Sequence, residues 1–385
     1  MSYGLRVFFV FPDGLPSVAH RATLAMMALL PRGHVEAVAC FLGEGPLVGI
    51  SRDEMGIETV LLTAARGSGA MTGGAARRAI EPVLRGARAH LVYDVGAPAH
   101  ATAGALAHRM GLRVVWSQFG TASFRSLLQV RAALAPAATV LAASSVAAQR
   151  QHRVNPRRVP IEVLPPGVKI PDEGLAARRE RARRALGFAA EDLVAGWVDA
   201  SGPGDTALRA AASLCHARSR ARLVILDDPA LPADRARQEA MRTLASSLGI
   251  GERVTLAPWL PGTGPSPALD ALDIAFFLPP APAVAALAPL ESLAAGVALV
   301  AADREPLREY VSPGRDAILV PPDDHEALAA ALLALADDPE HRRRLAAAGT
   351  ATVRDRFRVE ALAKRLAKTL RGLVGPDAAP REAHK

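Results

Sequence analysis

The stretch Leu290-Glu291-Ser292-Leu293-Ala294-Ala295-Gly296-Val297-Ala298-Leu299-Val300 decides the fold of this 385-residue chain. Its apolar end predicts a β-strand over Ala298–Ala301. Similar short apolar runs recur along the whole chain, and Ala-rich helical stretches lie between them. Such an alternation of strands and helices predicts an α/β protein with doubly wound parallel sheets.

The alternation occurs twice, because Pro165-Pro166-Gly167 and Pro171 interrupt it. We therefore expect one Rossmann-like domain over residues 1–170 and a second over 171–357, followed by a helix over 358–374 and a polar tail over 375–385. In the first domain the expected strands are Leu5–Phe11, Val35–Cys40, Glu58–Leu62, Leu91–Tyr93, Arg113–Trp116, Val140–Ala142 and Ile161–Leu164. In the second they are Val194–Trp197, Leu223–Leu226, Val254–Leu256, Ile274–Leu278, Ala298–Ala301 and Ile318–Val320, and helices are expected over Asp324–Ala336, Pro339–Arg356 and Val359–Leu373.

Composition narrows the class of protein. No apolar run reaches the roughly 20 residues of a membrane span, and Tyr3–Pro12 is better interpreted as a first strand than as a signal peptide, so we expect a cytoplasmic protein. Cys40 and Cys215 are too far apart to suggest a disulfide framework or a metal site. The net charge is +8, and all of the positive excess lies in the first 170 residues.

The quoted stretch, with Asp303 and Arg308-Glu309 after it, resembles the donor-nucleotide segment of the retaining family-4 glycosyltransferases, the glycosyl transferases of group 1. Supporting segments occur in the family's order: Arg32-Gly33-His34, Gly43–Leu47, Pro165–Val168 and Gly314–Pro322. The resemblance implies the GT-B fold, in which two Rossmann-like domains face a central cleft and a final helix crosses back to the first domain. It also implies that a hexose is transferred from a nucleotide sugar to an acceptor in that cleft.

Donor-site residues follow from the same resemblance. Glu291 would hydrogen-bond the nucleotide ribose, and Gly296 and Glu309 would complete the donor segment. Alternatively, Glu291 is an acid near a helix N-terminus, and Glu309 has a surface or packing role. A nucleotide diphosphate also needs cations or backbone N–H groups. Arg304, Arg308 and Arg209 are the candidates to supply that charge. The family uses no Asp-x-Asp metal motif, so no metal or cofactor is expected besides the donor.

Several positions depart from the family pattern. Ala283 stands where relatives have a first Glu, and Phe119 where they have a His next to the reacting sugar. Trp197 and Pro203 replace the Arg and Lys that bind the diphosphate, and Glu305-Pro306 replaces a Gly-Gly turn. Phenylalanine cannot transfer a proton, and proline has no N–H to offer. On the acceptor side, Gly14 and Gln118 are the remaining candidates.

A basic surface is a further expectation. On a helix over roughly 74–89, Arg77, Arg78, Arg85 and Arg88 would lie within an arc of about 100°. This face would dock on an anionic membrane surface, making the protein peripheral there, or on a protein partner. The alternative is a solvated helix face. No nucleic-acid partner is expected, because the chain has only three Trp and three Tyr for stacking.

Two functions remain. The first is a diverged glycosyltransferase that still uses a nucleotide-sugar donor. The second is an inactive pseudoenzyme of the same fold that acts as a binding or partner subunit, which the losses at Ala283, Trp197, Pro203, Pro306 and Phe119 would favour. An oxidoreductase is disfavoured, because no Gly-x-Gly-x-x-Gly motif follows an expected strand.

Overall fold

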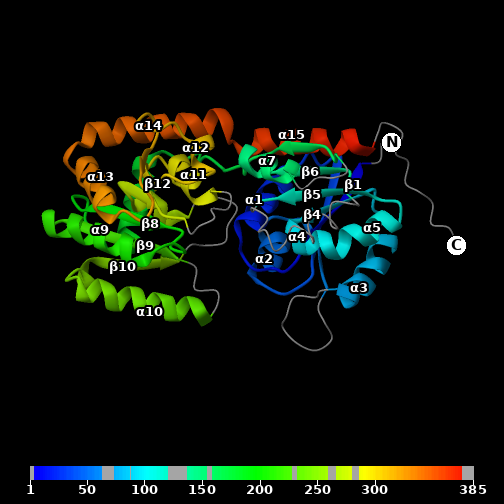
Figure 1. Cartoon of the computed structure of the whole chain (residues 1–385), viewed down its shortest axis with the longest axis horizontal. Coiled ribbons are helices and arrows are strands. Elements are labelled where there is room, and N and C mark those ends of the chain that lie inside the picture. Colours follow the sequence, from blue (N-terminus) through cyan, green and yellow to red (C-terminus); the bar gives the residue numbers. More distant parts are fainter. Residues whose placement is uncertain are drawn as a thin grey trace. The chain divides into compact units, whose positions relative to one another are not determined.

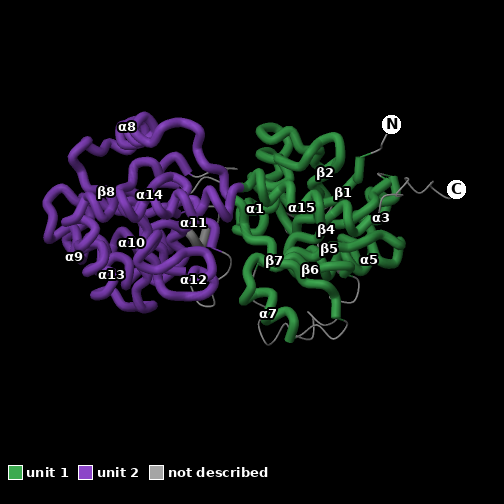
Figure 2. Tube along the Cα trace, turned by 90° about the horizontal axis from the view of Figure 1, so that it is seen from above, with its two compact units in different colours: residues 1–167, 359–385 green, residues 168–358 purple. Residues whose placement is uncertain are grey.

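The structure is a computed structural model, and it describes residues 4–62, 73–86, 88–119, 137–153, 158–227, 232–258, 266–279 and 286–374. The chain divides into two compact units (Figure 2). Unit 1 consists of residues 1–167 and 359–385, and unit 2 of residues 168–358. Each unit is an α/β layer structure built on one parallel sheet (Figure 1).

Unit 1 has a seven-stranded sheet with the order β3-β2-β1-β4-β5-β6-β7. Its strands are β1 (Leu5–Phe11), β2 (Val35–Phe41), β3 (Glu58–Leu61), β4 (Leu91–Val95), β5 (Arg113–Gln118), β6 (Thr139–Ala142) and β7 (Ile161–Val163). Its helices are α1 (Val18–Met27), α2 (Pro46–Gly49), η1 (Ile50–Glu54), α3 (Gly73–Gly86), α4 (Gly96–Ala99), η2 (His100–Gly104), α5 (Ala105–Arg109), α7 (Ser145–Arg153) and α15 (Val359–Val374).

Strand β1 shows why this sheet is covered on both faces. Successive side chains of a strand point to opposite faces, and every residue from Val7 to Phe11 is buried. Phe9 and Phe11 pack in the core that α1 and α15 cover. Phe8 and Val10 pack in the core that α3 and α5 cover. Because α15 supplies Leu362, Leu366 and Leu370 to the first of these cores, the end of the chain completes unit 1.

Unit 2 has a six-stranded sheet with the order β10-β9-β8-β11-β12-β13. Its strands are β8 (Leu193–Val198), β9 (Ala221–Asp227), β10 (Val254–Pro258), β11 (Ile274–Phe277), β12 (Ala298–Ala302) and β13 (Ile318–Val320). Its helices are α8 (Leu175–Leu186), α9 (Gly204–Ala217), α10 (Pro232–Ser247), η4 (Gly251–Arg253), η5 (Pro267–Ala271), α11 (Leu287–Ala294), α12 (Leu307–Tyr310), α13 (His325–Asp337) and α14 (Pro339–Arg356).

The doubly wound α/β prediction is confirmed, and each expected strand coincides with an observed one to within two residues at either end. In both sheets the strand order reverses beside the first strand, between β1 and β4 in unit 1 and between β8 and β11 in unit 2. Ligands of open parallel sheets bind outside the carboxyl ends of the strands at such a reversal. The loops after these strands are therefore the first place to look for a site.

Candidate functional site

The loop after β8 crosses closely over the end of β11 in unit 2. Asp199 has a left-handed backbone (φ 51°), and the amide of Ser201 donates to its carbonyl at 2.7 Å. A Cβ on Gly202 would lie 1.7 Å from the carbonyl oxygen of Leu278, just beyond β11. Only glycine allows this approach. The loop after β8 therefore contacts the backbone that follows β11 directly, at the strand-order reversal.

Helix α9 begins directly after this crossing and offers its first amides to the same edge of the sheet. Its N-cap residue, Pro203, provides no side-chain hydrogen bond to those amides. Trp197 is fully buried in the core with Met241 and lies 3.6 Å from where a Cβ of Gly204 would be. Trp197, which we expected to stand where the resembled family has a cation, is therefore a core residue. Arg209 on α9 forms an ion pair with Asp205 at 2.7 Å.

Glu291 is a buried acid on α11, the helix that follows β11. Only 4% of its surface is exposed, and its neighbours Leu290 and Ser292 are fully buried. The helix starts at Leu287 on the carboxyl edge of the sheet, and Glu291 is its fifth residue. The segment before the helix, which includes Ala283, lies outside the described residues.

Arg304 and Arg308 lie in the loop and short helix after β12, and each already has a carboxylate partner. Arg304 pairs with Asp323 at 2.6 Å, and Arg308 donates from Nε to Asp303 at 2.5 Å. The hydrogen bond from Arg308 lowers the pKa of Asp303, which keeps that carboxylate ionised. Glu309, in α12, is half-buried, and its backbone carbonyl accepts from Arg356 at 2.5 Å. Glu305 is exposed, and Pro306 is the N-cap residue of α12.

Gly296 lies at the opposite edge of the sheet from these residues. It follows α11 with a left-handed backbone (φ +81°), and its amide donates to the carbonyl of Leu293 at 3.1 Å. The amide of Val297 donates to Ser292 at 3.1 Å, which completes a Schellman helix end. The structure therefore explains Gly296 by the helix C-terminus that it closes, and does not bring it to the edge where Arg304 and Arg308 lie.

In unit 1 the predicted acceptor-side residues lie at the carboxyl edge. A Cβ on Gly14, after β1, would lie 2.8 Å from the amide nitrogen of Gly45, so this glycine allows two loops to touch. Gln118 ends β5, Phe119 follows it, and both are buried. A fully buried pair in the same unit, His100 and Asp94, was not identified from the sequence. The Nδ1 atom of His100 lies 2.7 Å from Oδ2 of Asp94, and the His100 ring stacks on Trp116 with 4.8 Å between the ring centroids.

The expected basic helix ends earlier than predicted. Helix α3 stops at Gly86, and Arg88 lies beyond it with a left-handed backbone (φ 50°), so Arg88 does not share a helical face with the others. Arg77 donates to the carbonyl of Ala101 at 3.0 Å, and Arg85 pairs with Glu81 at 2.8 Å. Arg78 is exposed. The arc of four arginines is therefore corrected to three helical residues, two of which are already bonded.

Among the described residues, no three His, Cys, Asp or Glu side chains are grouped to hold a metal ion. In the same part of the chain, no helix combines the length and the apolar character that crossing a membrane requires.

Residues 204–352 match the model of the family described as glycosyl transferases group 1. Unit 2 therefore contains a segment that is similar to group 1 glycosyltransferases. A D-inositol 3-phosphate glycosyltransferase of Thermomonospora curvata is 32% identical over 199 residues, which are 49% of this chain and 46% of that protein. The match thus spans just under half the length of that relative.

Solved structures match almost the whole chain at low identity. Anabaena Alr3699/HepE, crystallised with UDP and glucose, superposes with a TM-score of 0.78 at 18% identity, over 95% of this chain and 99% of that one. A sucrose-phosphate synthase from Thermosynechococcus elongatus superposes with a TM-score of 0.76 at 18% identity, over 96% and 99%. These likenesses show the fold, two parallel-sheet α/β domains of the GT-B type.

Proposed function

We propose that this protein is a glycosyltransferase that takes its sugar from a nucleotide donor bound at the carboxyl edge of unit 2. The observation that carries the proposal is Glu291, a buried acid on the helix that follows the reversal strand β11, inside the segment that matches group 1 glycosyltransferases. The retaining family-4 assignment is part of the proposal and rests on the resemblance of the segment from Leu290 to Glu309.

In this proposal Glu291 accepts hydrogen bonds from the nucleotide ribose. The diphosphate lies near the first amides of α9, which no side chain caps. Arg304 and Arg308 would have to exchange Asp323 and Asp303 for phosphate oxygens, and Arg209 would have to leave Asp205. Because each exchange breaks an existing ion pair, we expect the donor to bind more weakly than at a site with free cations.

UDP-sugars are the first donors to test, because Anabaena Alr3699/HepE was crystallised with UDP-glucose. Calorimetric titration with UDP, GDP, ADP and their sugars should give saturable binding for one nucleotide. Glu291→Gln should weaken that binding by about 10- to 100-fold, since a hydrogen bond to a charged group contributes about 1.5–3 kcal/mol. Glu252→Gln, an exposed acid outside the site, is the matched control.

Binding that Glu291→Gln leaves unchanged would contradict the placement of the donor, and absence of binding for every nucleotide would contradict the function. Turnover is measured separately, as release of the nucleoside diphosphate from each sugar nucleotide with and without candidate acceptors.

The second candidate is an inactive partner subunit of the same fold. The observation in its favour is that Arg209, Arg304 and Arg308 are all paired with carboxylates. Measurable wild-type turnover would reject it. Ala283→Glu discriminates further: it should change the rate or donor preference of an active enzyme, whereas a partner subunit should show no turnover with or without it.

A further inference from the structure

A second concave surface lies in unit 2, between α8 and α14. It is a groove of about 640 Å³ whose charged lining consists of Arg179, Arg342, Arg343, Arg354 and Asp273. Asp273 immediately precedes β11, and the lining residue Gly296 precedes β12. This α8–α14 groove therefore lies at the amino edge of the sheet, opposite the edge where the donor is proposed to bind.

The single carboxylate of the lining is already satisfied. Asp273 accepts from Arg179 at 3.1 Å, from Arg183 at 2.7 Å and from the amide of Val194 at 2.9 Å. Four arginines and one aspartate give the lining a net charge of +3. A positive excess of this size repels itself, so it favours an anion from solution.

Arg343 and Arg354 have no carboxylate partner within the part of the chain that the structure describes. Arg343 donates only to the carbonyl of Pro339, at 3.2 Å, and Arg354 makes no hydrogen bond or ion pair there. The two share one face of α14 with Ala347 and Thr350, since their spacings are three and four residues. Small side chains thus separate two exposed guanidinium groups and leave room over the helix.

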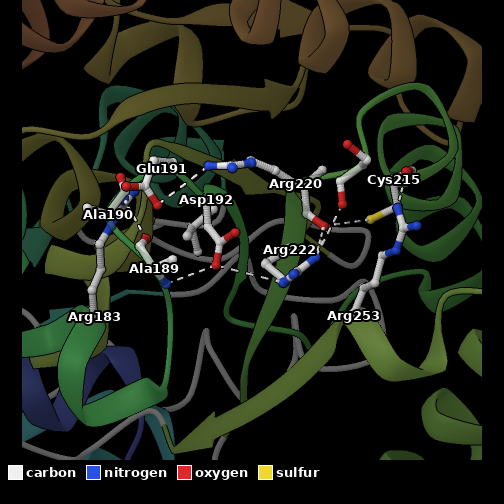
Figure 3. Close-up of polar contacts among 12 residues, drawn as sticks. Arg183, Ala189, Ala190, Glu191, Asp192, Cys215, Arg220, Arg222 and Arg253 are labelled. Atoms are coloured by element: carbon white, nitrogen blue, oxygen red, sulfur yellow. Dashed lines mark hydrogen bonds and ion pairs between the residues drawn. The ribbon is translucent and has the colours of Figure 1, made fainter.

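Many arginines of unit 2 are paired with carboxylates. Figure 3 shows the neighbouring part of its amino edge, where Arg220 pairs with Glu191 at 3.5 Å and Arg222 with Asp192 at 3.9 Å. On α14 itself, Arg344 pairs with Glu340 at 3.8 Å. An arginine-rich composition therefore does not by itself explain why Arg343 and Arg354 lack carboxylates.

Arg179, on the α8 side of the groove, also has a donor atom without a hydrogen-bond acceptor. Its Nε is buried without a hydrogen-bond partner. Burial lowers the pKa of Arg179; Asp273 opposes that effect, and the nearby charges of Arg183 and Arg342 lower the pKa further. An anion in the groove would reduce this repulsion between guanidinium groups.

We propose that the α8–α14 groove binds a small phosphorylated compound. Guanidinium groups match phosphate oxygens in a two-pronged geometry, and the volume is that of a metabolite site. Leu175 and Ala346 provide an apolar side against which the rest of the molecule would pack. The proposal does not depend on the glycosyltransferase function, because none of Glu291, Arg209, Arg304 and Arg308 lines the groove.

Inorganic pyrophosphate is the probe, titrated by calorimetry into the full chain at physiological salt. Wild type should show saturable binding, and Arg343→Ala/Arg354→Ala should weaken it by about tenfold or more, as expected when charge-assisted hydrogen bonds are lost. Arg344→Ala removes one positive charge, where the groove variant removes two, from the same helix outside the groove and should bind like wild type. All of these residues are exposed, and circular dichroism checks that the variants fold.

The double variant Arg304→Ala/Arg308→Ala tests whether pyrophosphate binds at the carboxyl edge of unit 2, where the donor is proposed to bind. If this pair abolishes pyrophosphate binding and the groove variant does not, the groove proposal is overturned. Absence of saturable binding to wild type, or an equal loss in Arg344→Ala, would overturn it as well.

Discussion

At the scale of single residues, the proposed donor edge depends on a glycine that sequence patterns did not mark. Gly202 lets the loop after β8 touch the carbonyl of Leu278, with no space for a Cβ. Gly14 has the same role in unit 1, where it meets the backbone of Gly45. The Gly202 contact joins loops at the strand-order reversal of unit 2, and the Gly14 contact joins the loops after the neighbouring strands β1 and β2. Both lie at a carboxyl edge, so both shape the surface on which a ligand would bind.

Gly202→Ala is expected to destabilise unit 2 by about 2–4 kcal/mol, because the added methyl group overlaps the Leu278 carbonyl and the loop must move. Gly372→Ala is the control. Gly372 lies in α15 with nothing within 4 Å of its would-be Cβ, and alanine there should stabilise by about 0.5–1 kcal/mol. Urea unfolding measures both variants. A Gly202 variant as stable as wild type would contradict the contact.

Cys40 provides a prediction about pH. Burial raises the pKa of its thiol to about 12, so the folded protein holds almost no thiolate between pH 7 and 9. Labelling of native Cys40 by a thiol reagent should therefore stay slow over that range. In the unfolded chain the thiol ionises near pH 8.5, so unit 1 should lose stability as the pH rises above this value. Fast labelling of the native protein at pH 8 would refute the burial.

At the scale of helices and strands, the hydrophobic pattern was sufficient to predict the limits of an element where the fold agrees with its local preference. Buried parallel strands such as β1 are continuous apolar runs, so their limits could be predicted from sequence. The end of α3 was missed because Arg88 is as helix-prone as Arg85, although Gly86, where the helix ends, is the kind of residue that closes helices.

The candidate site was less predictable than the fold, because several charged side chains there pair with residues outside their own helix or strand. Arg304 pairs with Asp323, which follows β13, and His100 pairs with Asp94 in β4. Neither pair has the spacing of three or four residues by which a helical pair is recognised in a sequence. The positions of Glu291 and Trp197 came from resemblance, and the structure adds that the first is a buried acid and the second a core residue.

Substitution of Asp324 would measure how much one helix cap contributes to the stability of unit 2. It caps α13 by accepting from the amides of Glu326 at 3.1 Å and Ala327 at 2.9 Å. Asp324→Ala should destabilise unit 2 by about 1 kcal/mol, since two helix-end donors lose their acceptor. Asp355→Ala, an exposed acid near the end of α14, should change stability by less than about 0.5 kcal/mol. Equal effects in urea unfolding would show that the cap is unimportant.

At the scale of the whole molecule, each unit has its own core and one buried cysteine. Cys40 lies in unit 1 and Cys215 in unit 2, and burial raises the pKa of both thiols. Thiol labelling therefore reports the opening of each unit separately. Domains generally unfold as units, so the two cysteines need not become reactive together.

Leu366→Ala in α15 should destabilise unit 1 alone. Leu366 is fully buried in the core that α15 shares with α1 and β1, and its truncation is expected to cost about 2–5 kcal/mol. Cys40 should then become reactive at lower urea than in wild type, while Cys215 keeps its wild-type midpoint. Lys368→Ala, on the exposed face of the same helix, is the control. A matching shift at Cys215 would contradict separate cores.

The return of α15 to unit 1 sets an order for synthesis. A ribosome makes the strands of unit 1 first, then all of unit 2, and only then the helix that covers the face holding Phe9 and Phe11. Unit 2 can fold as soon as it leaves the exit tunnel, because residues 168–358 are contiguous. Unit 1 must wait with an apolar face uncovered, so a nascent chain stopped before Val359 is the form that a chaperone would hold.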